Sequence, residues 1–465
     1  MTPLVPIVMF GIIPLALHLF GKYPARTAAA AVFVIGWLFL PQAKYDIPVL
    51  PDYAKTNAMG IAVLIGILAK DPKALERFRF QWIDIPMLCW CLAPLFSSIS
   101  NGLGAWDGGS AALGVAVGWG LPYVIGRIYF DTYDGQRELA IGMLIGGLVI
   151  APFALIEMVI SPQMHIIFYG WYPHDFSQTK RGGGYRPSVF MAHGLELAMW
   201  NAAAAFVGWQ LYLRKSLTKM VPLLNLPLLP AVAGLTAVLV LSRSSGALML
   251  FILAMGLFQL CAMFRTKIPL LLLLILPVVY MNLRATGAWD GQALIEAAGK
   301  AAGGNAERTG SLSFRLYNEN LLVEKALMRP VFGWAGYNRS FVTNEQGAYI
   351  SVPDGMWILT FGKYGIFGLT ALTASILLAP FLFFLLVPAR RLGEPLVAPA
   401  AAFATFLAVF MADNLLNAMY NPIMMVAAGG LSSLILARDA LRQTSDGQPA
   451  GLPAVEIGGP ATRVI

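Results

Sequence analysis

Charged residues are scarce in this chain, and their scarcity excludes an ordinary soluble domain. Asp, Glu, Lys and Arg make up 12% of the 465 residues and hydrophobic residues make up 58%, whereas soluble domains are about 25% charged. Apolar runs of roughly 17 to 25 residues recur along the chain, and each can cross about 30 Å of hydrocarbon as a helix. The composition therefore predicts an all-α, polytopic transmembrane helical bundle with about 12 to 13 spans.

Cysteine and histidine are also sparse, which argues against a metal or redox centre. The chain has three cysteines and four histidines. The cysteines all lie in apolar runs, and Cys89 and Cys91 have no histidine or further cysteine nearby to complete a metal site. We see neither a Walker loop nor a paired acidic cluster. We therefore expect no metal and no cofactor.

The apolar runs predict thirteen spanning segments. The first, MTPLVPIVMFGIIPLALHLFG, lacks the basic start and cleavage site of a signal peptide, so we expect it to be a span. The predicted segments cover residues 4–20, 25–41, 57–70, 84–100, 109–128, 137–160, 188–212, 222–241, 245–264, 268–283, 364–388, 397–416 and 421–438.

These segments divide the chain into four predicted parts. Residues 1–283 hold the first ten spans, and residues 284–355 form one large loop with a helix over 313–328. Residues 356–438 hold the last spans. Residues 439–465 are rich in Gly, Pro and Ser, and we expect a disordered tail.

The distribution of basic residues predicts the orientation in the membrane. Most Lys and Arg of the short loops follow odd-numbered segments, and those loops are therefore predicted to be cytoplasmic. The short loops after even-numbered segments hold only Lys44, Lys55, Lys180, Arg181, Arg186 and Arg243. The net charge of +8 then reflects membrane orientation and not nucleic-acid binding. This orientation places residues 163–187, 241–246 and 284–353 together on the outer side.

The large outer loop contains a polar amphipathic stretch, SLSFRLYNENLLVEKALMRPVFGWAGYNRS. Ser311 or Ser313 can cap a helix that Pro330 ends. A helical wheel places Arg315, Asn318, Glu319, Lys325 and Arg329 on one face. Such a helix can turn a cationic face toward a ligand, or it can simply cap the bundle with its charges in water.

Two further arginines are predicted on the same side. Arg243 interrupts an apolar region in LSRSSG, where an arginine is costly unless it is paired, snorkels or has a function. Arg186 lies just before Pro187, at the mouth of the seventh segment. His193 and Glu196 follow at a helical spacing and are interpreted as a buried polar pair that lines a cavity. Because arginine grips phosphate with two parallel donors, Arg186, Arg243 and Arg315 suggest an outer pocket for a lipid-linked phosphate or pyrophosphate.

Four motifs together resemble the O-antigen ligase and polymerase family. They are GYRPSVFMAHGLELAMW, VLSRSSGALML, SLSFRLYNENLLVEKALMRPVFGWAGYN and KYGIFGL, and the resemblance extends from Arg181 to Leu369. It implies an inverting, metal-independent glycosyltransferase of the inner (cytoplasmic) membrane, with its active site facing the periplasm. Such enzymes transfer a glycan from undecaprenyl pyrophosphate to an acceptor hydroxyl. The implied partners are this lipid-linked oligosaccharide, the lipid bilayer, a chain-length regulator and a flippase.

One departure from the family pattern favours polymerase over ligase. Ligases of the family carry a histidine–asparagine pair before the last motif, where this chain has Asp354 and Gly355. Asp354 is a candidate general base, and a helix N-cap is the alternative. The predicted catalytic residues are Arg186, Arg243, Arg315 and Asp354. The predicted substrate-binding residues are His193, Glu196, Asn318, Arg308, Tyr337 and Arg339.

Three alternative functions stay open. An O-antigen ligase or a protein O-oligosaccharyltransferase would use the same lipid-linked donor. A membrane transporter belongs to a different class, and it should show repeated halves with matching broken helices. The sequence shows no such internal symmetry, and its large loop occurs once.

Overall fold

A computed structural model describes residues 1–47, 51–181, 183–217, 219–301 and 306–437. The predicted tail over residues 439–465 lies outside this part of the chain. Helices dominate: α1 (Leu4–Lys22), α2 (Ala25–Phe39), α3 (Lys55–Lys70), α4 (Ile85–Ser100), α5 (Gly104–Val115), α6 (Leu121–Tyr129), α7 (Tyr133–Ile160), α8 (Met164–Tyr169), α9 (Gly194–Leu213), α10 (Leu228–Leu241), α11 (Ser245–Phe264), α12 (Ile268–Ala285), α13 (Gln292–Ala301), α14 (Ala306–Leu327), α15 (Met356–Leu386), α16 (Ala398–Leu416) and α17 (Pro422–Leu436).

Three short antiparallel hairpins decorate the connections. They pair β1 (Lys44–Tyr45) with β2 (Tyr53–Ala54), β3 (Lys180–Arg181) with β4 (Gly184–Tyr185), and β5 (Met220–Val221) with β6 (Leu226–Pro227). In the described part of the chain, eight helices are long and apolar enough to cross a membrane, and three shorter apolar helices accompany them. The predicted all-α polytopic bundle is confirmed. Each predicted segment coincides with one helix, except the fifth, which is α5 and α6 joined by a π-helical turn at residues 116–120.

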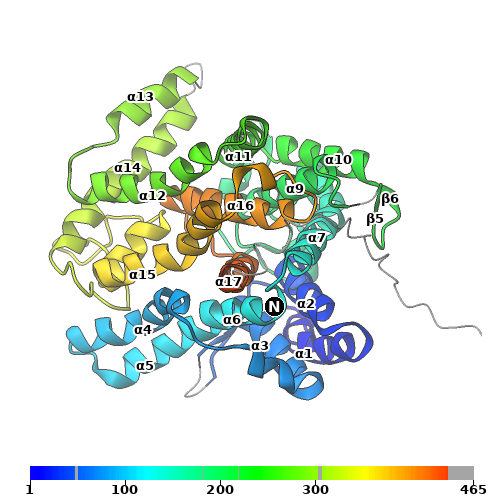
Figure 1. Ribbon diagram of the computed structural model, residues 1–465. Coiled ribbons are helices and arrows are strands. Elements are labelled where there is room, and N and C mark those ends of the chain that lie inside the picture. Colours follow the sequence, from blue (N-terminus) through cyan, green and yellow to red (C-terminus); the bar gives the residue numbers. More distant parts are fainter. Residues whose placement is uncertain (48–50, 182, 218, 302–305, 438–465) are drawn as a thin grey trace, which may run out of the picture.

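The most buried helices lie in the middle of the bundle. Figure 1 shows α16 and α17 near the centre, with α13 and α14 projecting at one edge. Gly126 of α6 and Gly429 of α17 let these two helices touch, since a Cβ on Gly429 would lie 2.0 Å from the carbonyl oxygen of Tyr123. Small residues at such contacts are typical of helix packing in membranes, where close backbone approach replaces the hydrophobic effect.

The connecting segments gather at two opposite ends of the bundle. At one end, Gln42 donates to His165 across 3.2 Å, Asn101 donates to the carbonyl of Gly333 across 2.8 Å, and Met356 donates to the carbonyl of Asn417 across 2.9 Å. We call this the insertion end, and its described segments are residues 40–47, 51–54, 101–103, 161–181, 183–193, 242–244, 286–301, 306–355 and 417–421. It unites the loops that the sequence predicts on the outer side.

The other end carries the loops with most of the basic residues. Tyr129 donates to Asp71 across 3.0 Å, and Lys267 donates to the carbonyl of Leu385 across 2.7 Å. These contacts join loops that follow odd-numbered segments. The separation of the two loop sets therefore agrees with the predicted order of spans, while the side of the membrane that each end faces stays a prediction.

The glycine-rich turn after α14 fills a break in α15. Gly365 has φ +64° and ψ −164°, outside the helical range, so four backbone groups of α15 lose their helical partners. Trp334 and Ala335 donate to the carbonyls of Gly362 and Lys363 across 2.9 and 2.8 Å, and Ile366 and Phe367 donate to the carbonyls of Pro330 and Val331 across 2.8 and 3.2 Å. The insertion therefore satisfies the backbone of a broken helix.

Candidate functional site

Arg186 and Arg243 reach each other from separate segments at the insertion end. Arg243 lies in the turn between α10 and α11 with φ +55°, and its side chain is exposed. Its Nη1 donates to the carbonyl of Arg181 across 3.2 Å, and its own carbonyl accepts from Nη2 of Arg186 across 3.4 Å. The β3–β4 hairpin completes the contact, because a Cβ on Gly184 would lie 2.5 Å from Cζ of Arg243. Glycine at 184 therefore leaves room for the guanidinium.

Arg186 is almost fully buried against the start of α9. Its backbone N–H donates to the carbonyl of Thr179 across 2.7 Å, and a Cβ on Gly194 would lie 2.5 Å from its Cγ. The stem of the side chain thus lies over the first residue of α9, which directs the guanidinium toward the Arg243 turn.

His193 caps α9 and does not lie within it. Its backbone is extended, with φ −147° and ψ 151°, and Nδ1 accepts from the N–H of Leu195 across 3.0 Å. The carboxylate of Glu196 reaches back to the N–H of Ala192 across 2.8 Å. The predicted placement of both residues within one helix is therefore wrong, because His193 precedes α9. The two side chains form a reciprocal cap of the kind that satisfies free N–H groups at a helix start.

A buried carboxylate on α7 explains why α9 starts six residues later than predicted. Oε2 of Glu157 accepts from the N–H groups of Ser188 and Val189 across 2.9 and 2.7 Å, and Oε1 accepts from Met164 across 2.8 Å. These bonds hold the segment before α9 in a non-helical path, with Val189 at φ +53°. No local sequence signal marks this role, because it depends on contacts between distant segments.

The positive charges of several neighbouring segments act on His193. Its pKa falls from 6.5 to about 3, first because of burial and then because of the positive charges of Arg186, His174, Arg315 and Arg181. The rings of His174 and His193 lie 4.9 Å apart. His193 is therefore neutral near pH 7 and sits inside a cluster of cationic side chains. We call Arg181, Arg186, Arg243 and Arg315 the arginine cluster.

Arg315 forms an ion pair with Asp354. Nε of Arg315 lies 3.4 Å from Oδ2 of Asp354, and both side chains are partly exposed. Burial raises the pKa of the Asp354 carboxyl, and the positive charges of Arg315 and His174 only partly oppose this shift. Gly355, and not Asp354, occupies the N-cap position of α15. Asp354 thus has no capping role and lies at the rim of the arginine cluster.

Asn318 positions Asp354. Its Oδ1 accepts from the N–H of Val352 across 2.7 Å, and its Nδ2 donates to the carbonyl of Phe314 across 2.8 Å. Asn318 is buried, and both ends of its amide are used within the protein. The structure therefore gives this predicted substrate-binding residue a positioning role, tying the segment before α15 to α14.

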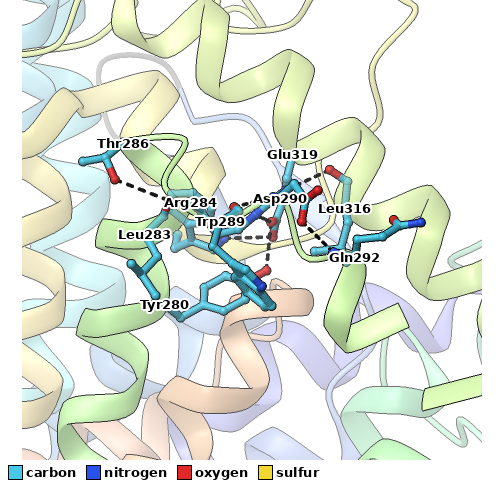
Figure 2. A network of polar contacts seen from close by, with 10 residues as sticks. Tyr280, Leu283, Arg284, Thr286, Trp289, Asp290, Gln292, Leu316 and Glu319 are labelled. Atoms are coloured by element: carbon cyan, nitrogen blue, oxygen red, sulfur yellow. Dashed lines mark hydrogen bonds and ion pairs between the residues drawn. The ribbon is translucent and has the colours of Figure 1, made fainter. Parts of the chain in front are cut away.

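Glu319 also differs from its predicted place on an open cationic face. Figure 2 shows its carboxylate between α12, α14 and α15. It accepts from Tyr280 across 2.8 Å, from Nε of Arg284 across 3.0 Å and from Nε1 of Trp357 across 3.0 Å. Arg284 also donates to the carbonyl of Leu316 across 2.9 Å, so both members of the buried ion pair are satisfied. This network fixes the helix that carries Arg315.

Several other polar residues of the insertion contact groups outside the arginine cluster. Lys325 and Arg329 stand over the ring of Trp334, 4.1 and 4.8 Å from its centroid. Tyr337 is exposed and donates to Asp107 of α5 across 3.3 Å. Arg339 follows in the same turn and is half-buried. The side chain of Arg308 lies outside the described part of the structure.

The helix bearing Arg315 starts earlier than predicted. α14 begins at Ala306, so Ser311 and Ser313 lie inside it and cap nothing. It ends at Leu327, three residues before Pro330, in agreement with the predicted stop. α14 packs against α13, a helix that was not predicted.

The arrangement brings a dense positive charge to one carboxylate. Arg186, Arg243, Arg315, His193 and Asp354 are all predicted site residues that the fold unites. His174 and Arg181 join them from the loop predicted over residues 163–187, in which only Arg186 was predicted as a site residue. Within the described ranges, His, Cys, Asp and Glu form no group of three or more that could hold a metal ion. Such a cluster can bind a polyanion and stabilise negative charge that develops on it.

Comparison with known proteins adds no assignment. No protein-family model matches the chain, and no curated protein matches it significantly.

Proposed function

We propose that the chain is a metal-independent glycosyltransferase that polymerises oligosaccharide units carried on undecaprenyl pyrophosphate. The observation that carries this proposal is a chain of arginine contacts at the insertion end. Arg186 donates to the carbonyl of Arg243, Arg243 donates to the carbonyl of Arg181, and Arg315 pairs with Asp354. A pyrophosphate is a compact polyanion, and planar guanidinium groups donate to its oxygens in pairs. The bundle places this cluster at the end of hydrophobic helices, where a lipid-linked headgroup would lie.

The proposed reaction has a single displacement step. The oxygen of an acceptor hydroxyl forms a bond to the anomeric carbon while the bond from that carbon to the pyrophosphate oxygen breaks. The electron pair leaves with the pyrophosphate, where the arginine cluster stabilises it. The hydroxyl proton passes to the carboxylate of Asp354, whose raised pKa makes it a better base than an exposed carboxylate.

Asp354 and Arg315 would separate when substrate binds. Their ion pair is partly exposed and 3.4 Å long, so solvent screening leaves it weak. A pyrophosphate with several oxygens competes well for Arg315, and the carboxylate is then free to accept a proton. In this proposal the site faces the periplasm, and a flippase and a chain-length regulator act with the enzyme.

The break in α15 gives no support to a transporter. Broken helices in transporters leave backbone groups free to bind ions or substrate. Here the groups on both sides of Gly365 are occupied by residues 330–335 of the insertion. The break serves to anchor the insertion.

The test is a comparison of arginine variants in cells that lack the native gene. Arg315→Ala should abolish polymer at normal protein level, and Arg315→Lys should restore only part of it, because a point charge cannot donate to two oxygens at once. Arg329→Ala is the matched control, since Arg329 is on the same insertion but stands over Trp334. Normal polymer from Arg315→Ala would refute the proposal, and single-unit transfer without elongation would indicate a ligase.

A further inference from the structure

A cavity lies at the insertion end, and no residue of the arginine cluster lines it. Its volume is about 490 Å³, within the range of roughly 300–1,000 Å³ for small-molecule sites. The β1–β2 hairpin and the start of α3 form one wall, and α5 forms the other. The lining side chains that matter chemically are Lys44, Asp46, Asp52, Asn57, Trp106 and Ser110.

The hairpin wall is firmly built. Asn57 at the start of α3 donates to the carbonyl of Asp52 across 2.9 Å. Tyr53 stacks on Phe10 of α1 with ring centroids 5.0 Å apart, and its hydroxyl donates to the carbonyl of Met9 across 2.8 Å. These contacts tie β2 and the start of α3 to the helix beneath them, so Asp52 and Asn57 are positioned by the protein itself.

The charge of this cavity is opposite to that of the arginine cluster. Lys44 and Asp52 form an ion pair of 2.5 Å, which leaves Asp46 as the excess charge among the lining residues. A slightly acidic cavity disfavours phosphate and pyrophosphate. It suits a neutral ligand rich in hydroxyl groups, because carboxylates accept hydroxyl protons and Lys44, Asn57 and Ser110 add further polar groups.

Trp106 supplies the apolar part of such a site. It lies on the first turn of α5 and is 70% exposed. The face of its ring is electron-rich, and the C–H groups on one face of a sugar ring carry the complementary partial charge. We propose that this cavity binds a neutral saccharide, with Trp106 stacked on a sugar ring and the polar side chains bonded to its hydroxyls.

The cavity is joined to the insertion that carries Arg315. Asp107, next to Trp106, accepts from Tyr337 of the turn after α14 across 3.3 Å. If the proposed polymerase function holds, the saccharide is a segment of the growing glycan, held while its linkage to the lipid is processed at the arginine cluster. Saccharide binding itself does not depend on that function and can be measured without turnover.

The experiment uses the full chain in lipid nanodiscs free of glycoside detergents, which would compete for the cavity. Neutral glucose-, galactose-, mannose- and N-acetylglucosamine-based oligosaccharides are tested at millimolar concentration by saturation-transfer NMR. We expect at least one to bind, and Trp106→Ala to weaken it about tenfold, as the loss of an aromatic contact implies. Ser110→Trp should block binding by filling the cavity while Trp106 stays in place.

Two control variants test whether the binding signal comes from this cavity. Trp82→Ala removes another exposed tryptophan, at the opposite end, and should leave binding unchanged. Arg315→Ala should keep oligosaccharide binding even where transfer is lost, so failure of the proposed function would not remove the signal. The proposal is overturned if no oligosaccharide binds, or if Ca²⁺ binds to the acidic groups and oligosaccharide does not. It is also overturned if Trp106→Ala and Ser110→Trp both bind oligosaccharide normally, because Trp106 would then be only an interfacial anchor.

Discussion

Loss of the Glu319 carboxylate should destabilise the protein far more than loss of any exposed carboxylate. Glu319→Ala leaves the Arg284 guanidinium buried without its counter-charge, because the ion pair is almost completely shielded from solvent. Breaking a buried ion pair by removing one partner costs about 3–5 kcal/mol. Tyr280 and Trp357 also lose their acceptor. Since these losses share one cluster, they are not additive, and we expect a total of about 3–5 kcal/mol.

The assay is thermal unfolding in detergent, with matched variants. Glu324→Ala removes an exposed glutamate from the same helix and should change stability by no more than about 0.5 kcal/mol. The double variant Arg284→Met with Glu319→Leu replaces both charges by apolar groups of similar size. It should recover most of the lost melting temperature, because the penalty of the single variant is an unpaired buried charge.

Equal stability of Glu319→Ala and Glu324→Ala would refute the buried network. A double variant no better than the single one would show that the cost arises from packing and not from the unpaired arginine.

Local features of the structure allow three further tests. Gly365→Ala places a Cβ 2.3 Å from the carbonyl oxygen of Val331 at φ +64°, and should lower the free energy of unfolding by more than the roughly 1–3 kcal/mol of backbone strain alone. Gly234→Ala is the control in the same melting assay, because no atom lies near its Cβ, and it should be neutral or stabilising by up to about 1 kcal/mol. Because the pKa of His193 is lowered in the folded protein, its contribution to stability is complete above pH 6.5 and is lost as the pH falls toward about 3. His193→Gln should flatten this part of the stability–pH curve, and an unchanged curve would contradict the burial of the neutral ring. In a background lacking Cys89, Cys91 and Cys261, Glu345→Cys should react with an impermeant maleimide in intact spheroplasts, whereas Glu76→Cys should react only after lysis. The reverse labelling pattern would invert the predicted topology.

The sequence was most informative for the membrane-spanning helices, because the hydrocarbon core of the bilayer restricts their composition. A spanning helix must be apolar over most of its length, so each of the thirteen predicted segments overlaps at least one helix. The errors lie at the insertion end, where Glu157 holds the segment before α9 in a non-helical path and α14 starts at Ala306, ahead of the predicted start. Helix starts of this kind depend on contacts with distant segments, and the periodicity of a single segment gives no information about such contacts.

The arginines of the candidate site could be predicted from the sequence, but the neighbours that complete the cluster could not. Arginines in a membrane protein are conspicuous, so Arg186, Arg243 and Arg315 were found from the sequence. Their neighbours His174 and Arg181 were not, since nothing in their local sequence shows that the β3–β4 hairpin turns back toward α9. Glu319 was assigned to the wrong environment because a helical wheel shows which residues share a face, and not whether Arg284 and Trp357 cover that face.

Glycan transfer by the purified protein tests the role of the arginine cluster most directly. The protein is placed in nanodiscs with an undecaprenyl-pyrophosphate-linked repeat unit and EDTA, and the products are separated by length. We expect extended glycan together with released undecaprenyl pyrophosphate, at a rate that Arg315→Ala lowers by at least about a hundredfold, as for loss of one charge-stabilising donor, and that Arg329→Ala leaves unchanged. Extension that requires a divalent ion, or that proceeds equally well in Arg315→Ala, would contradict the claim that the arginine cluster holds the leaving pyrophosphate.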